Sequence, residues 1–143
     1  MLKATYDTNI LVSGFTISQG SVAFVMNAWL NDEVDMITSA PLIDELARTF
    51  EKSYFSTRLT EKQRQSLIAL VRDRTTIVPV IPPLPTVATH PEDNFVLATA
   101  ESGKASYIVT GDHGLLSLRQ FNGIQIVNSR SFSGILKSGN PEL

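Results

Sequence analysis

Residues 4–10 read Ala-Thr-Tyr-Asp-Thr-Asn-Ile, a short β-leaning run that stops abruptly on polar residues. The run ends at Asp7, Thr8 and Asn9, and apolar residues resume at Ile10. We therefore predict that Asp7 lies at the C-terminal tip of a first buried strand. In open parallel α/β sheets, ligands bind in the crevice outside such tips. Aspartate and asparagine also cap helices and turns in many proteins, so Asp7 alone does not decide between the two roles.

Segments typical of strands and helices alternate along the rest of the chain. Strands are predicted at 34–38, 76–81, 107–110 and 124–127. Helices are predicted at 21–30, 40–52, 61–74, 90–102, 115–118 and 129–137. This alternation predicts a single α/β domain over residues 1–143, with a mostly parallel central sheet and helices on both faces.

Local signals refine these boundaries. Gly14 and Gly20 are expected to bracket a polar link before the first predicted helix. Thr89 and Glu92 have the spacing of a capping box, which predicts that Thr89 caps the helix that follows. Proline cannot donate to a sheet ladder, so a group of prolines either places the strand at 76–81 on an edge of the sheet or lets it end in extended coil. These prolines are Pro79, Pro82, Pro83 and Pro85.

Composition excludes several kinds of site. The chain has 143 residues, of which 43% are hydrophobic and 18% are charged, as in ordinary globular domains. It has no cysteine, so it can form neither a disulfide nor a thiolate zinc site. Two histidines are too few for a histidine-rich metal site, whereas fourteen Asp and Glu leave oxygen-only cation sites possible.

Charge and hydropathy give weaker expectations. The formal net charge of −2 does not favour nucleic-acid binding, although it says nothing of local patches. The sequence shows neither a positively charged leader with an apolar core nor an apolar run of membrane-spanning length. We therefore expect a cytoplasmic protein that does not associate with membranes.

Four acids share an unusual placement in the predicted elements. Asp7 and Asp112 follow strands, and Glu45 borders the apolar face of its helix, whereas its neighbour Asp44 is expected to point away from that face. Asp93 lines up with the apolar stripe of its helix and so is expected to face inward. If the strands that end at Asp7 and Asp112 are neighbours, all four carboxylates could converge on one crevice.

Such convergence would need a cation. Two like charges about 4 Å apart repel by roughly 4 kcal/mol at an effective dielectric constant near 20. Protonation or a divalent cation offsets this repulsion. Carboxylates without thiolate or imidazole partners favour Mg²⁺ or Mn²⁺, and such sites serve phosphodiester hydrolysis well.

The order of these motifs resembles the PIN-domain family. The resemblance rests on Asp7-Thr8-Asn9 after an opening strand, an inward Glu45, Asp93-Asn94, and Thr110-Gly111-Asp112, and it extends over almost the whole chain. It is strongest to bacterial PIN proteins described as toxins of toxin–antitoxin pairs, the VapC-like proteins. The resemblance implies a Mg²⁺- or Mn²⁺-dependent endoribonuclease that acts on RNA, is silenced by a cognate antitoxin protein, and forms a homodimer.

The resemblance also implies roles for individual residues. The catalytic and metal-binding acids would be Asp7, Glu45, Asp93 and Asp112, and the supporting polar groups would be Asn9 and Thr110. Two positions depart from the pattern of many relatives, because His90 and Gly114 stand where further acids are common. This departure favours one firmly held ion over two, and it leaves a non-catalytic PIN-fold binding or scaffold module as the alternative function.

Other candidate sites are less favoured. A response-regulator receiver is set aside, because Asp7-Thr8-Asn9 lacks paired acids and no lysine follows the last strand. His90 and His113 could shuttle protons or bind metal, but single loop histidines are more often surface residues. Five cations could flank a groove and meet phosphates, although a solvated helix face explains most of them. They are Arg48, Lys52, Arg58, Lys62 and Arg64.

Overall fold

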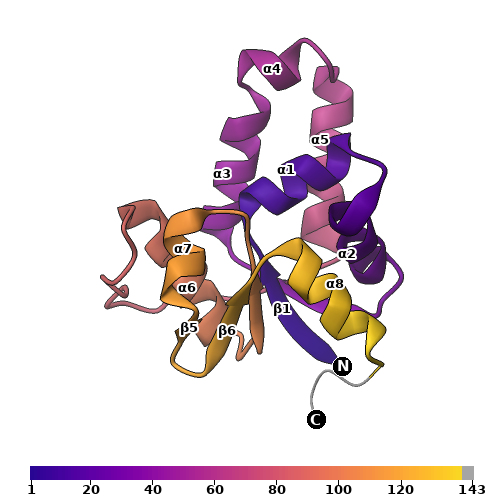
Figure 1. The fold of residues 1–143 in the computed structure, drawn as a ribbon. Helices are drawn as coiled ribbons and strands as arrows, with labels where there is room; N and C mark the ends of the chain where they lie inside the picture. Colours follow the sequence, from indigo (N-terminus) through magenta and orange to yellow (C-terminus); the bar gives the residue numbers. More distant parts are fainter. Residues whose placement is uncertain (140–143) are drawn as a thin grey trace.

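Six strands form one sheet in the order β3-β2-β1-β4-β6-β5 in a computed structural model that describes residues 1–139 (Figure 1). All neighbouring strands pair in parallel except β5, which runs antiparallel to β6 at one edge. The strands are β1 (Leu2–Tyr6), β2 (Val34–Thr38), β3 (Thr76–Ile77), β4 (Tyr107–Val109), β5 (Gln120–Phe121) and β6 (Ile124–Val127). The predicted mostly parallel α/β fold is confirmed.

Helices connect the strands and cover both faces of the sheet. They are α1 (Thr8–Thr16), α2 (Gly20–Leu30), α3 (Ala40–Phe50), α4 (Ser53–Ser56), α5 (Glu61–Asp73), α6 (Asn94–Ser102), α7 (His113–Leu118) and α8 (Ser129–Lys137), with a 3₁₀ turn η1 (Pro91–Asp93) before α6. Side chains alternate across a strand, so a central strand such as β2 contributes to the cores on both faces of the sheet. Met36 belongs to the core shared with α1, α2 and α8, whereas the next residue, Ile37, belongs to the core under α6 and α7.

The topology places the ends of β1 and β4 side by side. β1 pairs with β2 on one side and with β4 on the other, and the chain order reverses there. In this class of sheet, that reversal opens a crevice at the carboxyl ends of the strands. Asp7 directly follows β1 and Asp112 comes shortly after β4. The condition that the sequence left open, that these two acids end neighbouring strands, is therefore met.

The first helix differs from the sequence prediction. Gly14 does not begin a polar link but lies inside α1, which runs from Thr8 to Thr16. A Cβ at Gly14 would come within 2.2 Å of the Met26 side chain on α2. Gly14 therefore allows α1 and α2 to approach closely, a packing requirement that local propensity does not reveal.

One strand boundary and one helix cap differ from the prediction. The strand predicted at 76–81 is only Thr76–Ile77, because the prolines that follow cannot continue the ladder, although its place at the sheet edge is confirmed. Thr89 does not cap a helix. The chain instead makes the turn η1 after His90, and α6 begins at Asn94. Residues 140–143 of the predicted 1–143 domain lie outside the described residues.

No single helix in residues 1–139 has both the length and the apolar character needed to cross a membrane. α1 and α2 together meet that test by length and composition only, and they are bent by 101° relative to each other.

One buried polar atom in β1 leads to a stability prediction. The Thr5 hydroxyl is fully buried and has no hydrogen-bond partner among the described residues. Leaving such a group unpaired costs about 1–3 kcal/mol. Thr5→Val keeps the shape and suits a strand, so we expect the free energy of unfolding to rise by about 1 kcal/mol.

Urea denaturation measures this change, and Thr110→Val is the matched control. Thr110 is equally buried, but its hydroxyl makes two hydrogen bonds, so the same substitution should destabilise the protein there. Equal destabilisation by both variants would contradict the assignment of Thr5 as unpaired.

Candidate active site

Asp7 is the most buried acid at the carboxyl edge of the sheet. It follows β1 directly, and only 6% of its surface is exposed. Its Oδ1 accepts a hydrogen bond of 2.8 Å from the Thr8 backbone N–H, and its Oδ2 accepts one of 2.7 Å from the Thr110 hydroxyl. Asp7 also caps the N-terminus of α1. The capping role considered from the sequence is therefore real, and it does not remove the carboxylate from the crevice.

Thr110 links this carboxylate to the end of β4. Its buried hydroxyl donates to Asp7 and accepts a 3.0 Å hydrogen bond from the backbone N–H of Asp112. Oδ2 of Asp112 in turn accepts a 2.9 Å bond from the N–H of Leu115, and so caps α7. One oxygen of Asp112 is thus fixed by the helix.

Glu45 reaches the same place from α3. The Thr8 hydroxyl donates a 3.1 Å hydrogen bond to Oε2 of Glu45, across 37 positions of the chain. Glu45 is half-buried, whereas its neighbour Asp44 is exposed, as the helical spacing predicted. Thr8 holds its neighbour Asp7 through the backbone and Glu45 through the side chain. Sequence reasoning missed this role, although Thr8 lies between the two polar residues that it singled out.

Asp93 comes from the turn η1 rather than from the body of a helix, and it is half-buried. Its pKa is raised above the ordinary value, first by partial burial and then by the negative charge of Asp112, with a smaller contribution from Glu45. The nearby His90 acts in the opposite direction. Asp93 therefore lies within electrostatic reach of acids from two other elements.

The same coupling acts on Asp7. The pKa of Asp7 is raised to about 6, first by burial and also by the charges of Glu45 and Asp93, against the lowering effects of the Thr110 and Thr8 hydrogen bonds. The structure thus brings the four predicted acids into one interacting group at the β1 and β4 tips. Their roles as catalytic residues or metal ligands stay predictions.

The family comparison agrees with this arrangement. The model of the PIN domain family matches residues 3–114, a span that contains all four acids. This chain belongs to the PIN domain family. The resemblance stated from the sequence is confirmed.

Solved structures of low sequence identity share the PIN fold of this chain. A structure of VapBC2 from Rickettsia felis bound to a DNA fragment from its promoter has a TM-score of 0.62 at 16% identity, covering 89% of this chain and 98% of that one. DNA-bound VapBC from Salmonella typhimurium has a TM-score of 0.59 at 19% identity, covering 90% and 99%. PAE2754 from Pyrobaculum aerophilum has a TM-score of 0.61 at 17% identity, covering 96% and 90%. No curated protein matches the sequence at a significant level.

The donor chemistry of this PIN domain fits a hard divalent cation. The four acids supply only carboxylate oxygens, the ligands that Mg²⁺ and Mn²⁺ prefer. Within residues 1–139, no three Asp, Glu or His side chains are gathered closely enough to hold an ion as they stand. Binding would therefore require the less buried acids, Glu45 and Asp93, to move toward Asp7. Their mutual repulsion favours the separated arrangement until a cation is bound.

The supporting residues differ in how firmly they are held. Thr110 is fully buried and joins two of the acids, as described above. Asn9 is exposed, and its Oδ1 accepts only a long bond of 3.4 Å from the Gly111 N–H. Thr110 therefore has a clear structural reason to be present, whereas Asn9 makes a weak link between the same two strand tips.

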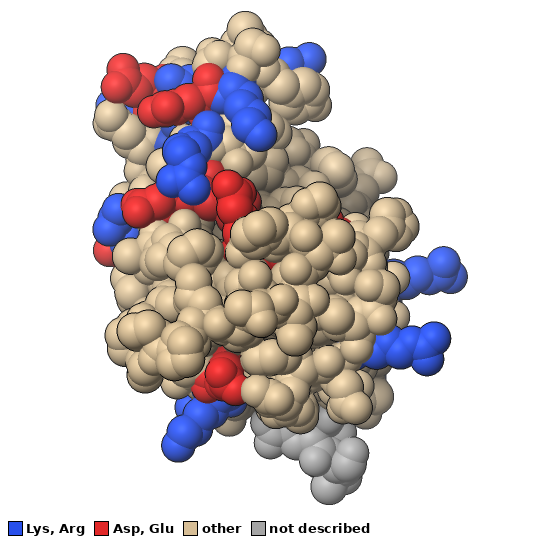
Figure 2. Space-filling model, turned by 90° about the vertical axis from the view of Figure 1, so that its left-hand side faces the viewer, with Lys and Arg blue, Asp and Glu red and all other residues tan. Residues whose placement is uncertain are grey.

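A hollow of about 250 Å³ lies along α3, and of the four acids Glu45 lines it. Glu45, Arg48 and Glu92 lie on its wall, together with the half-buried Phe95. Figure 2 shows carboxylates crowded in the upper left part of one face of the molecule, with basic side chains immediately above them. Two of the five cations proposed to flank a groove are tied down locally: Arg58 stacks on Tyr54, and Arg64 donates to the Leu59 carbonyl.

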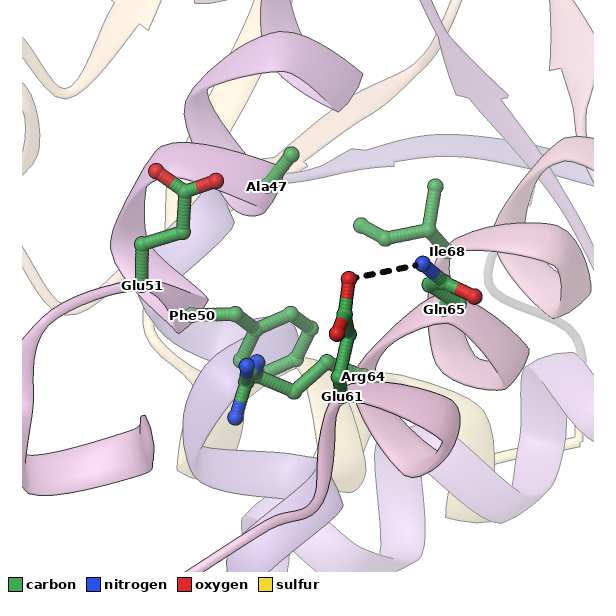
Figure 3. A pocket seen from close by; sticks show the side chains of 7 residues that line it. All are labelled: Ala47, Phe50, Glu51, Glu61, Arg64, Gln65 and Ile68. Carbon is green, nitrogen blue, oxygen red and sulfur yellow. Dashed lines mark hydrogen bonds between the residues drawn. The ribbon is translucent and has the colours of Figure 1, made fainter. Parts of the chain in front are cut away.

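A second hollow, of about 280 Å³, lies between α3 and α5 (Figure 3). Phe50 lies in it, and a hydrogen bond of 3.3 Å joins Gln65 to Glu61 on the α5 side. None of the four acids lines this hollow, so it is separate from the crevice.

The raised pKa of Asp7 predicts a pH-dependent stability. The pKa of Asp7 is about 6 in the folded protein, against an ordinary value of 3.8. The contribution of Asp7 to the free energy of unfolding is therefore fully present below pH 3.8 and is lost as pH rises through about 6. The loss is on the order of 3 kcal/mol. Asparagine cannot ionise and can keep the bond from Thr8, so Asp7→Asn should stabilise the metal-free protein more at pH 7.5 than at pH 4.5.

Denaturation in EDTA at both pH values measures this difference. The exposed Asp44→Asn provides the control, and it should show no such change. A stability difference between Asp7→Asn and the parent that is equal at the two pH values would contradict the raised pKa.

Proposed function

We propose that this PIN domain is a Mg²⁺- or Mn²⁺-dependent endoribonuclease and the toxin component of a toxin–antitoxin pair. The observation that carries the proposal is the electrostatic coupling of four carboxylates at the tips of β1 and β4. A fold does not benefit from such mutual repulsion, whereas a cation bound by several carboxylates would offset it.

Asp7, Glu45, Asp93 and Asp112 would hold the cation. When bound, a divalent ion supplies Lewis-acid chemistry to a phosphodiester, orienting and acidifying a water and neutralising developing charge. Thr110 fixes the orientation of Asp7, and the N–H of Leu115 fixes one oxygen of Asp112. Metal ligation requires ionised carboxylates, so the raised pKa of Asp7 makes cation affinity fall below about pH 6.

The polar residues around the crevice do not include a well-placed general base. His90 and His113 are both exposed, and neither makes a hydrogen bond to the acids within residues 1–139. We therefore assign no proton-transfer role to histidine. Ionised carboxylates that orient the cation and the water are the contribution of this chain.

The proposed partner is an antitoxin protein. The structural relatives from Rickettsia felis and Salmonella typhimurium are VapBC structures bound to DNA, which is a property of those proteins. By analogy, we propose that this chain pairs with an antitoxin encoded beside it. The homodimer, the RNA substrate and the cytoplasmic setting stay predictions, and co-purification with the product of a neighbouring gene tests the antitoxin directly.

A non-catalytic binding or scaffold module is the second candidate function. It is favoured by His90 and Gly114, which stand where many relatives have acids, and by the absence of three gathered carboxylates in residues 1–139. The two functions differ in their response to metal and in RNA cleavage.

Metal binding predicts a stabilisation that depends on Glu45. A ligand that binds only the folded state raises the melting temperature by mass action. We expect millimolar Mn²⁺ to raise the melting temperature of the parent, and Glu45→Gln to weaken that rise. Asp44→Asn, one position away on the exposed side of α3, should leave it intact. A melting temperature that neither Mn²⁺ nor Mg²⁺ changes would count against a cation site.

Asp112→Asn separates the enzyme from the scaffold. Asparagine caps helices about as well as aspartate, so α7 should keep its cap. Loss of one repelling charge should leave the metal-free protein no less stable than the parent. RNA cleavage with Mn²⁺ should nevertheless fall by about a hundredfold or more, which is roughly 2.7 kcal/mol of transition-state stabilisation.

The control for this experiment is the parent protein freed of any antitoxin. If the parent itself cleaves no RNA with Mn²⁺ present, the scaffold function is correct. If Asp112→Asn cleaves as well as an active parent, Asp112 acts only as a helix cap.

A further inference from the structure

A groove of about 510 Å³ lies between the start of α2 and the length of α8, two helices that pack side by side (Figure 1). Its lining comes from Gly20, Ser21 and Phe24 on α2 and from Arg130, Ser133, Gly134 and Lys137 on α8. None of the four acids of the crevice lines it.

The charge of this groove is opposite to that of the crevice. Arg130 and Lys137 are exposed, and no Asp or Glu lines the groove. Within residues 1–139, neither cation forms an ion pair with a carboxylate. Lys137 lies 4.8 Å from the centre of the partly exposed Phe24 ring. In a chain with a net charge of −2, this is a local concentration of positive charge beside an aromatic surface.

Among the described residues, Ser133 adds an unpaired polar donor to the lining of the groove. Ser133 is 4% exposed, and its hydroxyl makes no hydrogen bond in the described part of the chain. At the start of α2, the N-cap residue Gln19 makes no capping hydrogen bond with its side chain, and the first turn of α2 carries no acidic residue. The first N–H groups of a helix lack partners within it and carry partial positive charge. An anion is the ligand that both kinds of donor would accept.

The groove is open at its glycines. A Cβ built at Gly20 or at Gly134 would meet no atom within 4 Å. Gly134 also lies inside α8, where glycine costs about 1 kcal/mol relative to alanine. Packing therefore does not require glycine at this position. The absence of a side chain at Gly134 leaves more open space in the groove.

The groove opens near the carboxyl edge of the sheet. β1, β4 and β6 run in parallel, and the N–H of Thr110 after β4 donates to the Val127 carbonyl at the end of β6. Arg130 comes in the first turn of α8, directly after β6. The basic groove therefore begins at the sheet edge that also carries Asp7 and Asp112.

We infer that this groove binds a backbone phosphate of the RNA strand, away from the bond that is cleaved. Arg130, Lys137, the Ser133 hydroxyl and the helix N–H groups are donors of the kinds that contact phosphates. Phe24 offers a face on which a base can stack, as in many single-strand sites. The identification of the bound strand as RNA rests on the proposed ribonuclease function. The presence of an anion site in the groove does not depend on that function.

RNA binding without metal tests the groove separately from catalysis. We would titrate labelled single-stranded RNA against the parent and against Arg130→Gln in EDTA, over a series of salt concentrations. Arg130→Gln should raise Kd by about tenfold at low salt and lower the slope of log K against log salt by about 0.7. Arg72→Gln is the matched control, because it removes one exposed cation from α5 and should leave both values unchanged.

Substitution at Gly134 tests occupancy of the groove. Gly134→Glu and Gly134→Gln add side chains of similar size, and both should preserve α8 because Glu and Gln favour helices over Gly. The glutamate variant should weaken RNA binding more than the glutamine variant, and equal melting temperatures would show that both are folded. Equal binding by the parent, Arg130→Gln and Gly134→Glu would overturn the inference.

Two further measurements distinguish RNA phosphate from free phosphate and test the groove separately from the proposed ribonuclease function. If inorganic phosphate binds in the groove and RNA does not, the assignment of the phosphate to RNA would be overturned. In cleavage assays with Mn²⁺, Arg130→Gln should raise KM for long RNA, leave kcat unchanged, and leave a dinucleotide substrate unaffected. A parent that binds RNA through the groove without cleaving it would contradict the ribonuclease but support the groove.

Discussion

The hydroxyl of Thr110 is the small group on which the geometry of the crevice depends. It donates to Asp7 and accepts from the Asp112 backbone, so one oxygen atom ties together the ends of two adjacent strands. A hydroxyl has a single proton to donate and can accept as well, and here both capacities are used. The tie is fully buried and is reinforced by the parallel pairing of β1 and β4. Disturbing it would displace two acids together.

The same region carries an energetic cost. Burial and two neighbouring carboxylates raise the pKa of Asp7 to about 6, so at neutral pH the ionised acid opposes folding. Two hydrogen bonds to its oxygens reduce this cost without removing it. Sites that work on charged substrates commonly store such unfavourable electrostatics, and a bound cation relieves them. In the proposed nuclease, metal binding and stability would therefore be coupled through Asp7.

The charges of this PIN domain are sorted between two surfaces. Carboxylates gather at the β1 and β4 tips, whereas the groove between α2 and α8 is lined by cations without acids. A uniform negative surface would repel RNA, and the near-neutral net charge conceals this separation. For the proposed ribonuclease, an acidic centre for a cation and a separate basic surface for the backbone would be complementary requirements of one polyanionic substrate.

The sequence alone was enough to predict the α/β class and the parallel sheet, because these depend on local periodicity. It also singled out four acids from their places at strand ends and on helix faces, and their roles stay predictions. It also predicted that Glu45 faces inward and Asp44 outward, since helical spacing fixes their relative directions. It could not predict that Gly14 lies in a helix, because that glycine is needed for contact with Met26, a residue twelve positions away. Nor could it reveal the bond between Thr8 and Glu45, the link through Thr110, or the union of α2 with α8 around a basic groove. Each of these joins residues distant in the chain, and only the packing of the sheet and its helices decides which distant residues meet.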